Sequence, residues 1–241
     1  MSEAKWTLHQ RDACEFLRSL PADSVDLIVT DPAYCSLEKH RAVGTTTRLV
    51  KEWFPVVPNT YYPDFFCACY YTLKKNTHLY MYCDDETAYI VKPLAEAQGF
   101  KYHKRLVWDK MKIGMGYHYR ARCEYILFFE KGKRKLNNLG MPDVFDIKED
   151  PEGYILECAR IRNGYPTQKP SSVSAKLICQ SSAPGELIVD PFCGSSSVGV
   201  AAIQNERRYI GNDIMDAAIK TSTEQLVTAS ELSLKQGKLF E

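Results

Sequence analysis

Two apolar segments that each end in an acid–proline pair most constrain the fold of this chain. Residues 25–29 lead to Asp31 and Pro32, and residues 187–189 lead to Asp190 and Pro191. Uninterrupted apolar runs of this kind are typical of buried strands in parallel sheets. Open α/β sheets bind ligands at the carboxyl ends of their strands, so we expect both acid–proline pairs to lie at a binding site.

Strand-like and helix-like segments alternate along most of the chain, which predicts an α/β fold with a mostly parallel sheet. Stop signals such as Pro21 and Gly99 follow two of the expected helices. Strands are expected at 25–29, 77–83, 102–108, 123–130, 187–189 and 208–211, and helices at 13–20, 64–74, 86–98, 171–182, 196–205 and from 214 onward.

The composition is that of a soluble globular protein. The 241 residues are 45% hydrophobic and 25% charged, enough to bury a full α/β core. Since no stretch approaches the roughly 20 apolar residues of a membrane span, we expect a cytoplasmic protein. The nine cysteines are scattered, and Cys67 and Cys69 lack a second pair, so we expect reduced thiols and no metal site.

Charge is unevenly distributed although the formal net charge is only +1. Residues 101–135 contain eleven Lys or Arg and three acids, whereas acids predominate over the next twenty or so residues. This polarity is typical of a face that binds phosphates, but a solvated hairpin rim explains it equally well.

The second acid–proline pair belongs to a pattern that predicts a nucleoside site. In LIVDPFCGSSSVG an apolar strand, an acid and a loop of small residues lead into a helix, so backbone amides can approach a ligand closely. Asp213 ends the next strand and can bind both hydroxyls of a ribose. No phosphate-binding Lys is present, and Ser196 stands where a dinucleotide fingerprint has Gly. S-adenosylmethionine is therefore the natural candidate.

The first pair begins the loop Asp31-Pro32-Ala33-Tyr34, which suits chemistry on an amino group. An exocyclic amino group of a base is a poor nucleophile because its lone pair is delocalised into the ring. The Asp31 carboxylate and the Pro32 carbonyl can accept its two hydrogens, and Tyr34 offers a stacking face for a base turned out of its duplex. In isolation such a tetrapeptide is more often an ordinary turn.

With DPAY placed about 160 residues before DPFCGSSSVG, the chain resembles the amino-methylating DNA methyltransferases of the permuted β class. Segments 79–82, 106–110, 123–127 and 166–170 agree with that family. The resemblance implies a Rossmann-like S-adenosylmethionine-dependent methyltransferase fold in circularly permuted motif order. The expected sheet is mostly parallel and seven-stranded, with helices on both faces, in one domain over residues 1–241.

The resemblance also implies roles for individual residues. Asp31, Pro32 and Tyr34 are the expected catalytic residues. The expected cofactor-binding residues are Asp31, Thr167, Gln168, Lys169, Asp190, Pro191, Phe192, Gly194, Ser195 and Asp213. Segments 36–60 and 110–165 are candidates for target recognition, with Lys39, Arg41, Arg48, Lys112, Arg120, Arg122, Lys133 and Arg134 as candidate DNA contacts.

The implied reaction is methylation of adenine N6 in double-stranded DNA. Asp31 favours adenine, because the enzymes that methylate cytosine N4 more often begin this motif with serine. Ala33 departs from the family pattern by replacing a second proline. Alternatives are a cytosine N4 methyltransferase, an RNA methyltransferase or an inactive DNA-binding homologue, and a homodimer contact could use the same exposed segments.

Overall fold

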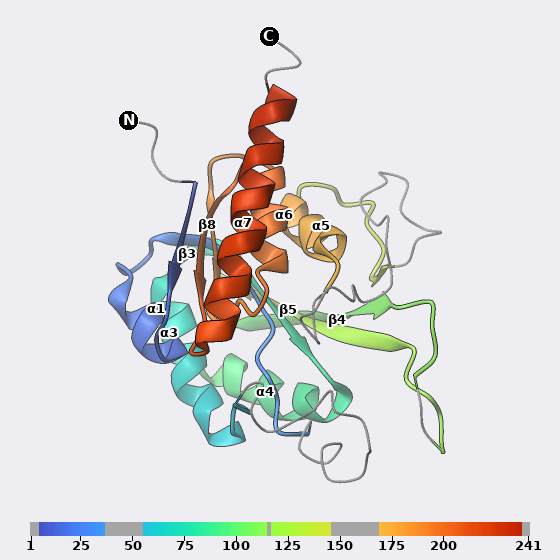
Figure 1. Cartoon of the computed structure of the whole chain (residues 1–241). Helices are drawn as coiled ribbons and strands as arrows, with labels where there is room; N and C mark the ends of the chain where they lie inside the picture. The colour runs from blue at the N-terminus through green and yellow to red at the C-terminus, as the bar shows by residue number, and fades with distance from the viewer. Residues whose placement is uncertain (1–4, 37–54, 115–116, 146–168, 238–241) are drawn as a thin grey trace.

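The computed structural model describes residues 5–36, 55–114, 117–145 and 169–237, and these form one sheet covered by helices on both faces (Figure 1). The strands are β1 (Trp6–His9), β2 (Val25–Thr30), β3 (Leu73–Cys83), β4 (Lys101–Asp109), β5 (Cys123–Lys131), β6 (Val144–Phe145), β7 (Leu187–Asp190) and β8 (Arg208–Asn212). The helices are α1 (Ala13–Ser19), the 3-10 turn η2 (Asn59–Tyr61), α3 (Tyr62–Thr72), α4 (Asp85–Ala97), α5 (Ser171–Ser181), α6 (Ser197–Gln204) and α7 (Asp216–Gly237). Of these helices, none is long and apolar enough to cross a bilayer.

The strand order β1-β8-β7-β2-β3-β5-β4-β6 confirms the mostly parallel sheet, since only the β3–β5 and β4–β5 pairs are antiparallel. Within the residues that the structure describes, the sheet contains eight strands, whereas seven were expected. A two-residue strand such as β6 is too short to show a period-two pattern. It pairs with β4 nonetheless, and Phe145 is buried.

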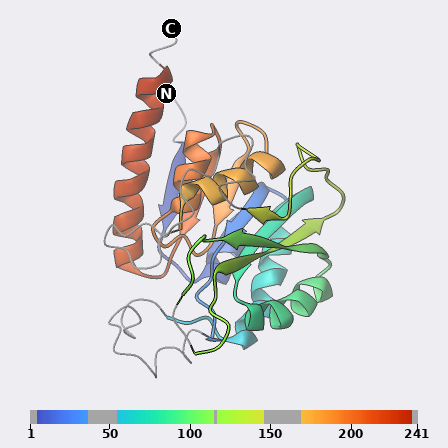
Figure 2. The ribbon, with the colours of Figure 1, turned by 90° about the vertical axis from the view of Figure 1, so that its right-hand side faces the viewer.

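Strands β2 and β7 lie side by side at the centre of the sheet although they are far apart in the chain. Leu27 pairs with Ile188 and Ile28 with Val189 in parallel register. Alternate residues of β2 contribute to separate hydrophobic clusters on the two faces. Helices α1, α3 and α4 pack on one face and α5, α6 and α7 on the other (Figure 2).

Most helix boundaries follow local capping chemistry. The side chain of Asp12 accepts hydrogen bonds from the amides of Cys14 and Glu15 at the start of α1. Helix α3 was expected to extend to residue 74, but it ends at Thr72 because Leu73 already pairs with Val25 as the first residue of β3. Tertiary pairing here overrides helix propensity.

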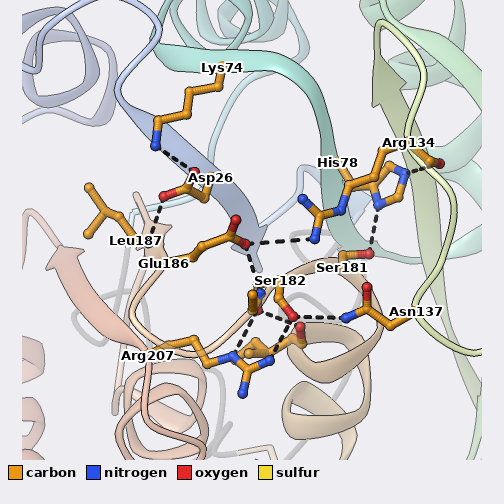
Figure 3. A network of polar contacts seen from close by, with 12 residues as sticks. Asp26, Lys74, His78, Arg134, Asn137, Ser181, Ser182, Glu186, Leu187 and Arg207 are labelled. Carbon is orange, nitrogen blue, oxygen red and sulfur yellow. Dashed lines mark hydrogen bonds and ion pairs between the residues drawn. The ribbon is translucent and has the colours of Figure 1, made fainter.

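The edge of the sheet where the parallel strands begin is held by polar contacts (Figure 3). Asp26 accepts hydrogen bonds from Lys74 Nζ at 2.6 Å and from the Leu187 amide at 2.9 Å, joining β2 to β3 and β7. His78 is fully buried, and burial lowers its pKa to about 4. The network stabilises the sheet end opposite to that reached by the acid–proline pairs.

Candidate active site

The adjacent ends of β2 and β7 open into one cavity of about 300 Å³. Its walls contain the described residues that the sequence predicted for catalysis and cofactor binding: Asp31, Pro32, Tyr34, Lys169, Asp190, Pro191, Phe192, Gly194, Ser195 and Asp213. Thr167 and Gln168 lie outside the described residues. The two loops, distant in sequence, therefore form a single site.

The loop after β7 is shaped by left-handed backbone conformations. Gly194 has φ +51°, and its amide donates to Asp213 Oδ2 at 3.0 Å. Ser196 has φ +57°, a conformation that favours glycine. Its hydroxyl donates to Ser222 Oγ at 2.9 Å, and Ser222 in turn donates to the Gly194 carbonyl at 2.8 Å. These hydroxyl contacts with α7 hold the serine where a glycine would be expected.

Burial raises the pKa of two carboxyl groups in the cavity. Asp190 is 2% exposed, and burial raises its pKa to about 8 although the Phe192 amide donates to it at 3.1 Å. Burial also raises the pKa of Asp213, which accepts a second amide hydrogen bond from Met215 at 3.0 Å. Carboxyl groups whose pKa is raised by loss of solvent beside an open cavity are typical of ligand-binding sites.

The loop Asp31 to Tyr34 is fastened to the segment that follows it in the cavity wall. The Val57 amide donates to the Ala33 carbonyl at 2.7 Å, and Tyr34 pairs with Val57 in an isolated parallel bridge. Pro55 and Pro58 flank this contact and also line the cavity. The end of the predicted recognition segment 36–60 is thus a wall of the cavity.

Lys169 connects the two halves of the site. Its ammonium donates to the Asp31 carboxylate, lies 3.7 Å from Glu124 Oε2 and is 4.8 Å from the centre of the Tyr82 ring. The residue is only 7% exposed. Glu124 also pairs with Lys110 at 3.4 Å, so alternating charges link Asp31 to the start of the 110–122 segment.

Residues 25–224 match the sequence model of the N6/N4 methyltransferase family, whose members are described as DNA methylases. The chain belongs to this DNA methylase family. It is a DNA methyltransferase that acts on an amino nitrogen, as the order of the two motifs predicted.

Relatives of this DNA methylase carry consistent names. The DNA adenine methyltransferase YhdJ of Escherichia coli (strain K12) is 27% identical, over 98% of this chain and 87% of the relative. The type II methyltransferase M.HpaI of Haemophilus parainfluenzae is also 27% identical, over 89% of this chain and 72% of the relative.

Solved structures confirm the methyltransferase fold. A putative DNA modification methylase from Thermus thermophilus matches with a TM-score of 0.67 and 21% identity, covering 92% of this chain and 95% of that one. The same methylase has been solved in complex with S-adenosyl-L-methionine. The cytosine-N4-specific PvuII DNA methyltransferase also gives a TM-score of 0.67, at 15% identity and over 95% of this chain and 93% of that one. The fold is therefore shared with an enzyme specific for cytosine.

Two cavity residues of this DNA methylase were not expected from its sequence. Asp12 caps α1 and also accepts a hydrogen bond from the Tyr61 hydroxyl at 2.7 Å, and both residues line the cavity. β1 is parallel to β8, so its carboxyl end reaches the same edge as Asp213. Because β1 was not among the expected strands, the sequence indicated only the capping role of Asp12.

The candidate DNA contacts separate into distinct groups. Lys112, Arg120 and Arg122 lie between β4 and β5, where Asp109 pairs with Cys123 near the carboxyl end of β3. This is the cavity edge of the sheet. Lys133 and Arg134 follow the other end of β5, where Lys131 pairs with Thr77 in the first half of β3. The structure places these two residues at the opposite edge, away from the cavity. Lys39, Arg41 and Arg48 lie outside the described residues.

Proposed function

We propose that this DNA methylase transfers the methyl group of S-adenosylmethionine to adenine N6 in duplex DNA. The observation that carries the proposal is the meeting of the Asp31 loop and the Asp190 loop in one cavity. A transferase must hold its donor and acceptor in contact, because proximity provides much of the rate gain in such reactions. We also propose that the chain forms one methyltransferase domain.

The residues of the cavity fit the cofactor. Asp213 can accept hydrogen bonds from the ribose hydroxyls, Gly194 lines the cavity without a side chain, and Phe192 gives an apolar wall. The volume of about 300 Å³ lies at the lower end of the range for small-molecule sites. When bound, S-adenosylmethionine supplies an electrophilic methyl group on a sulfonium.

Asp31 and Pro32 hold the target amino group. The Asp31 carboxylate accepts one amino hydrogen and the Pro32 carbonyl the other, which turns the nitrogen lone pair out of conjugation. Tyr34 stacks on the base once it has left the duplex. Lys169 is a positioning residue in this scheme, because its ammonium holds the Asp31 carboxylate.

Adenine is favoured over cytosine by the acid at position 31 and by the similarity to a DNA adenine methyltransferase. Cytosine N4 is the second candidate. The cytosine-N4-specific PvuII enzyme matches this fold with the same TM-score as the DNA modification methylase from Thermus thermophilus. Both reactions place an amino group on the same carboxylate. The identity of the methylated nucleoside separates them.

The test uses purified protein, tritiated S-adenosylmethionine and genomic DNA, followed by digestion to nucleosides and mass detection. We expect N6-methyladenine, and loss of the signal in Asp31→Ala and Asp31→Asn. Asp64→Asn, which changes an exposed acid of α3, is the matched control. N4-methylcytosine as the product would replace adenine by the second candidate. Full activity in both Asp31 variants would refute the catalytic assignment.

A second arm of the experiment tests the nucleic acid. Duplex DNA and structured RNA compete for methylation in one reaction, and we expect the label in DNA. Sequencing of DNA from cells that express the protein then gives the methylated motif, which supplies defined duplexes for kinetics. Label found only in RNA would contradict the proposed substrate.

A further inference from the structure

Residues 110–114 and 117–122 lie between β4 and β5 at the cavity edge of the sheet, and we call them the hairpin arm. Its first residue, Lys110, pairs with Glu124, which lies 3.7 Å from Lys169. Lys169 contacts the Asp31 carboxylate. Three ion pairs in series therefore connect the first residue of the arm to Asp31, the group proposed to hold the target amine.

The base of the hairpin arm is held in place by hydrogen bonds. Asp109 Oδ1 accepts from the Met111 amide and from Arg122 Nε, both at 2.7 Å. The hydrogen bond from Arg122 is the main cause that lowers the pKa of Asp109. Further along, the Gly114 amide donates to the Ala121 carbonyl at 2.8 Å. These contacts pair the two sides of the arm at its base.

The tip of the hairpin arm carries two tyrosines that are fully exposed. Tyr117 and Tyr119 have exposed fractions of 104% and 109%, as in an extended peptide. Ile113 on the same arm is 55% exposed. Large apolar groups gathered on one exposed segment are typical of an interaction surface rather than of ordinary solvated loops.

The charge of the hairpin arm favours a polyanionic partner. The arm contains Lys110, Lys112, Arg120 and Arg122 and no Asp or Glu. Cations interleaved with aromatic rings suit a ligand that has both phosphates and flat bases. A duplex being opened beside the cavity presents both, since the target base leaves an unstacked gap behind it.

We propose that the hairpin arm binds duplex DNA and that Tyr117 and Tyr119 stack in the gap left by the displaced target base. The proposal rests on the proposed function, and it adds the residues that stabilise the opened duplex. Stacking on the exposed rings offsets the loss of base stacking in the DNA. Lys112 and Arg120 of the arm contact the flanking phosphates, while Lys110 and Arg122 keep their ion pairs at its base.

The first measurement asks whether DNA covers the arm. Hydrogen–deuterium exchange of the full chain is followed with S-adenosylhomocysteine, with and without a duplex that contains the methylated motif. We expect slower exchange over the hairpin arm when duplex is added, and no change around Lys133 at the opposite edge. Unchanged exchange over the arm would overturn the proposal. Protection that grows with protein concentration in the absence of DNA would assign the surface to a second copy of the chain, and would overturn it too.

The second measurement asks whether the tyrosines support base displacement. The double variant Tyr117→Ala/Tyr119→Ala is compared with wild type on a matched duplex and on one whose target base faces an abasic site. We expect kcat/KM to fall at least about tenfold on the matched duplex and to recover on the abasic one, where less stacking is lost. Tyr71→Ala is the control, since Tyr71 is half exposed near the end of α3, at the edge away from the cavity.

The outcomes separate this proposal from the proposed function. An equal loss on both duplexes, or no loss on either, would overturn the stacking role. If the product is N4-methylcytosine, adenine is refuted as the target base. The double variant and wild type are then compared on duplexes in which the target cytosine faces guanine or an abasic site. If no DNA is methylated, the proposed function fails, while the exchange measurement with genomic DNA fragments still decides whether the arm binds a duplex.

Discussion

The Lys169 ammonium lies against the Asp31 carboxylate, although 138 positions separate the two residues in the chain. The contact joins the loop after β2 to the start of α5, on the wall of the same cavity. Glu124 holds Lys169 from the other side at 3.7 Å. The carboxylate proposed to receive the target amine is therefore held by a cation that is itself paired.

Replacing Lys169 by Met should reduce methylation. A charge-assisted hydrogen bond contributes about 1.5–3 kcal/mol, which corresponds to a loss of about tenfold to a hundredfold in kcat/KM. Lys169→Arg should retain part of the activity because it keeps the cation. Initial rates on a defined duplex measure both effects. Lys104→Met, which breaks an ion pair with Asp143 away from the cavity, is the control, and an equal loss there would contradict the prediction.

Asp213→Asn should weaken cofactor binding without unfolding the protein. The amide oxygen can still accept from the Gly194 amide, but the hydrogen bond from the Met215 amide and the negative charge offered to the ribose hydroxyls are lost. We expect the Kd for S-adenosylhomocysteine, measured by calorimetry, to rise about tenfold or more. Asp216→Asn, an exposed acid in the first turn of α7, should leave the Kd unchanged. Equal affinities for wild type and Asp213→Asn would exclude a role in ribose binding.

Asp190 should make the cofactor-free protein less stable as pH rises. Its pKa is about 8 in the fold against an ordinary value of 3.8, so the unfolded chain loses this proton before the folded one does. Stability from this group is complete below about pH 4 and is lost progressively up to about pH 8, at about 1.4 kcal/mol per pKa unit.

Asp190→Asn tests this dependence because the amide stays neutral throughout that range. The Tm of wild type should fall relative to that of Asp190→Asn between pH 5 and pH 8, measured without cofactor. Other titrating groups are common to both proteins and cancel in the difference. A Tm difference that does not change with pH would show that Asp190 is ionised in the fold.

Arg207→Leu should destabilise the fold without changing the cavity. Arg207 is 8% exposed and donates to Ser182 Oγ at 3.0 Å and to the carbonyls of Ser182 and Asn205 at 2.6 Å, in the network of Figure 3. Leaving these acceptors unpaired should cost about 2–4 kcal/mol in the free energy of unfolding, measured with urea. Arg208→Leu, at the exposed neighbouring position, should cost less than about 1 kcal/mol. Similar losses in the two variants would contradict the assigned role.

Local patterns in the sequence were sufficient for much of the fold and for the two loops of the site. The strand before Asp31, the strand before Asp190 and the cap at Asp12 each depend on a few neighbouring residues, and all three lie where they were expected. The order of the two motifs also predicted the methylase family. These features are visible in one dimension because periodicity, capping and turn chemistry act over short distances along the chain.

Only the tertiary structure decided which distant groups meet. The pairing of β2 with β7, the contact of Lys169 with Asp31 and the contact of Asp12 with Tyr61 depend on how the sheet is ordered. The same ordering sends the hairpin arm to the cavity edge and Lys133 to the other, although both lie in one basic stretch of sequence. Strand order results from packing both faces of the whole sheet, so no local run of residues encodes it.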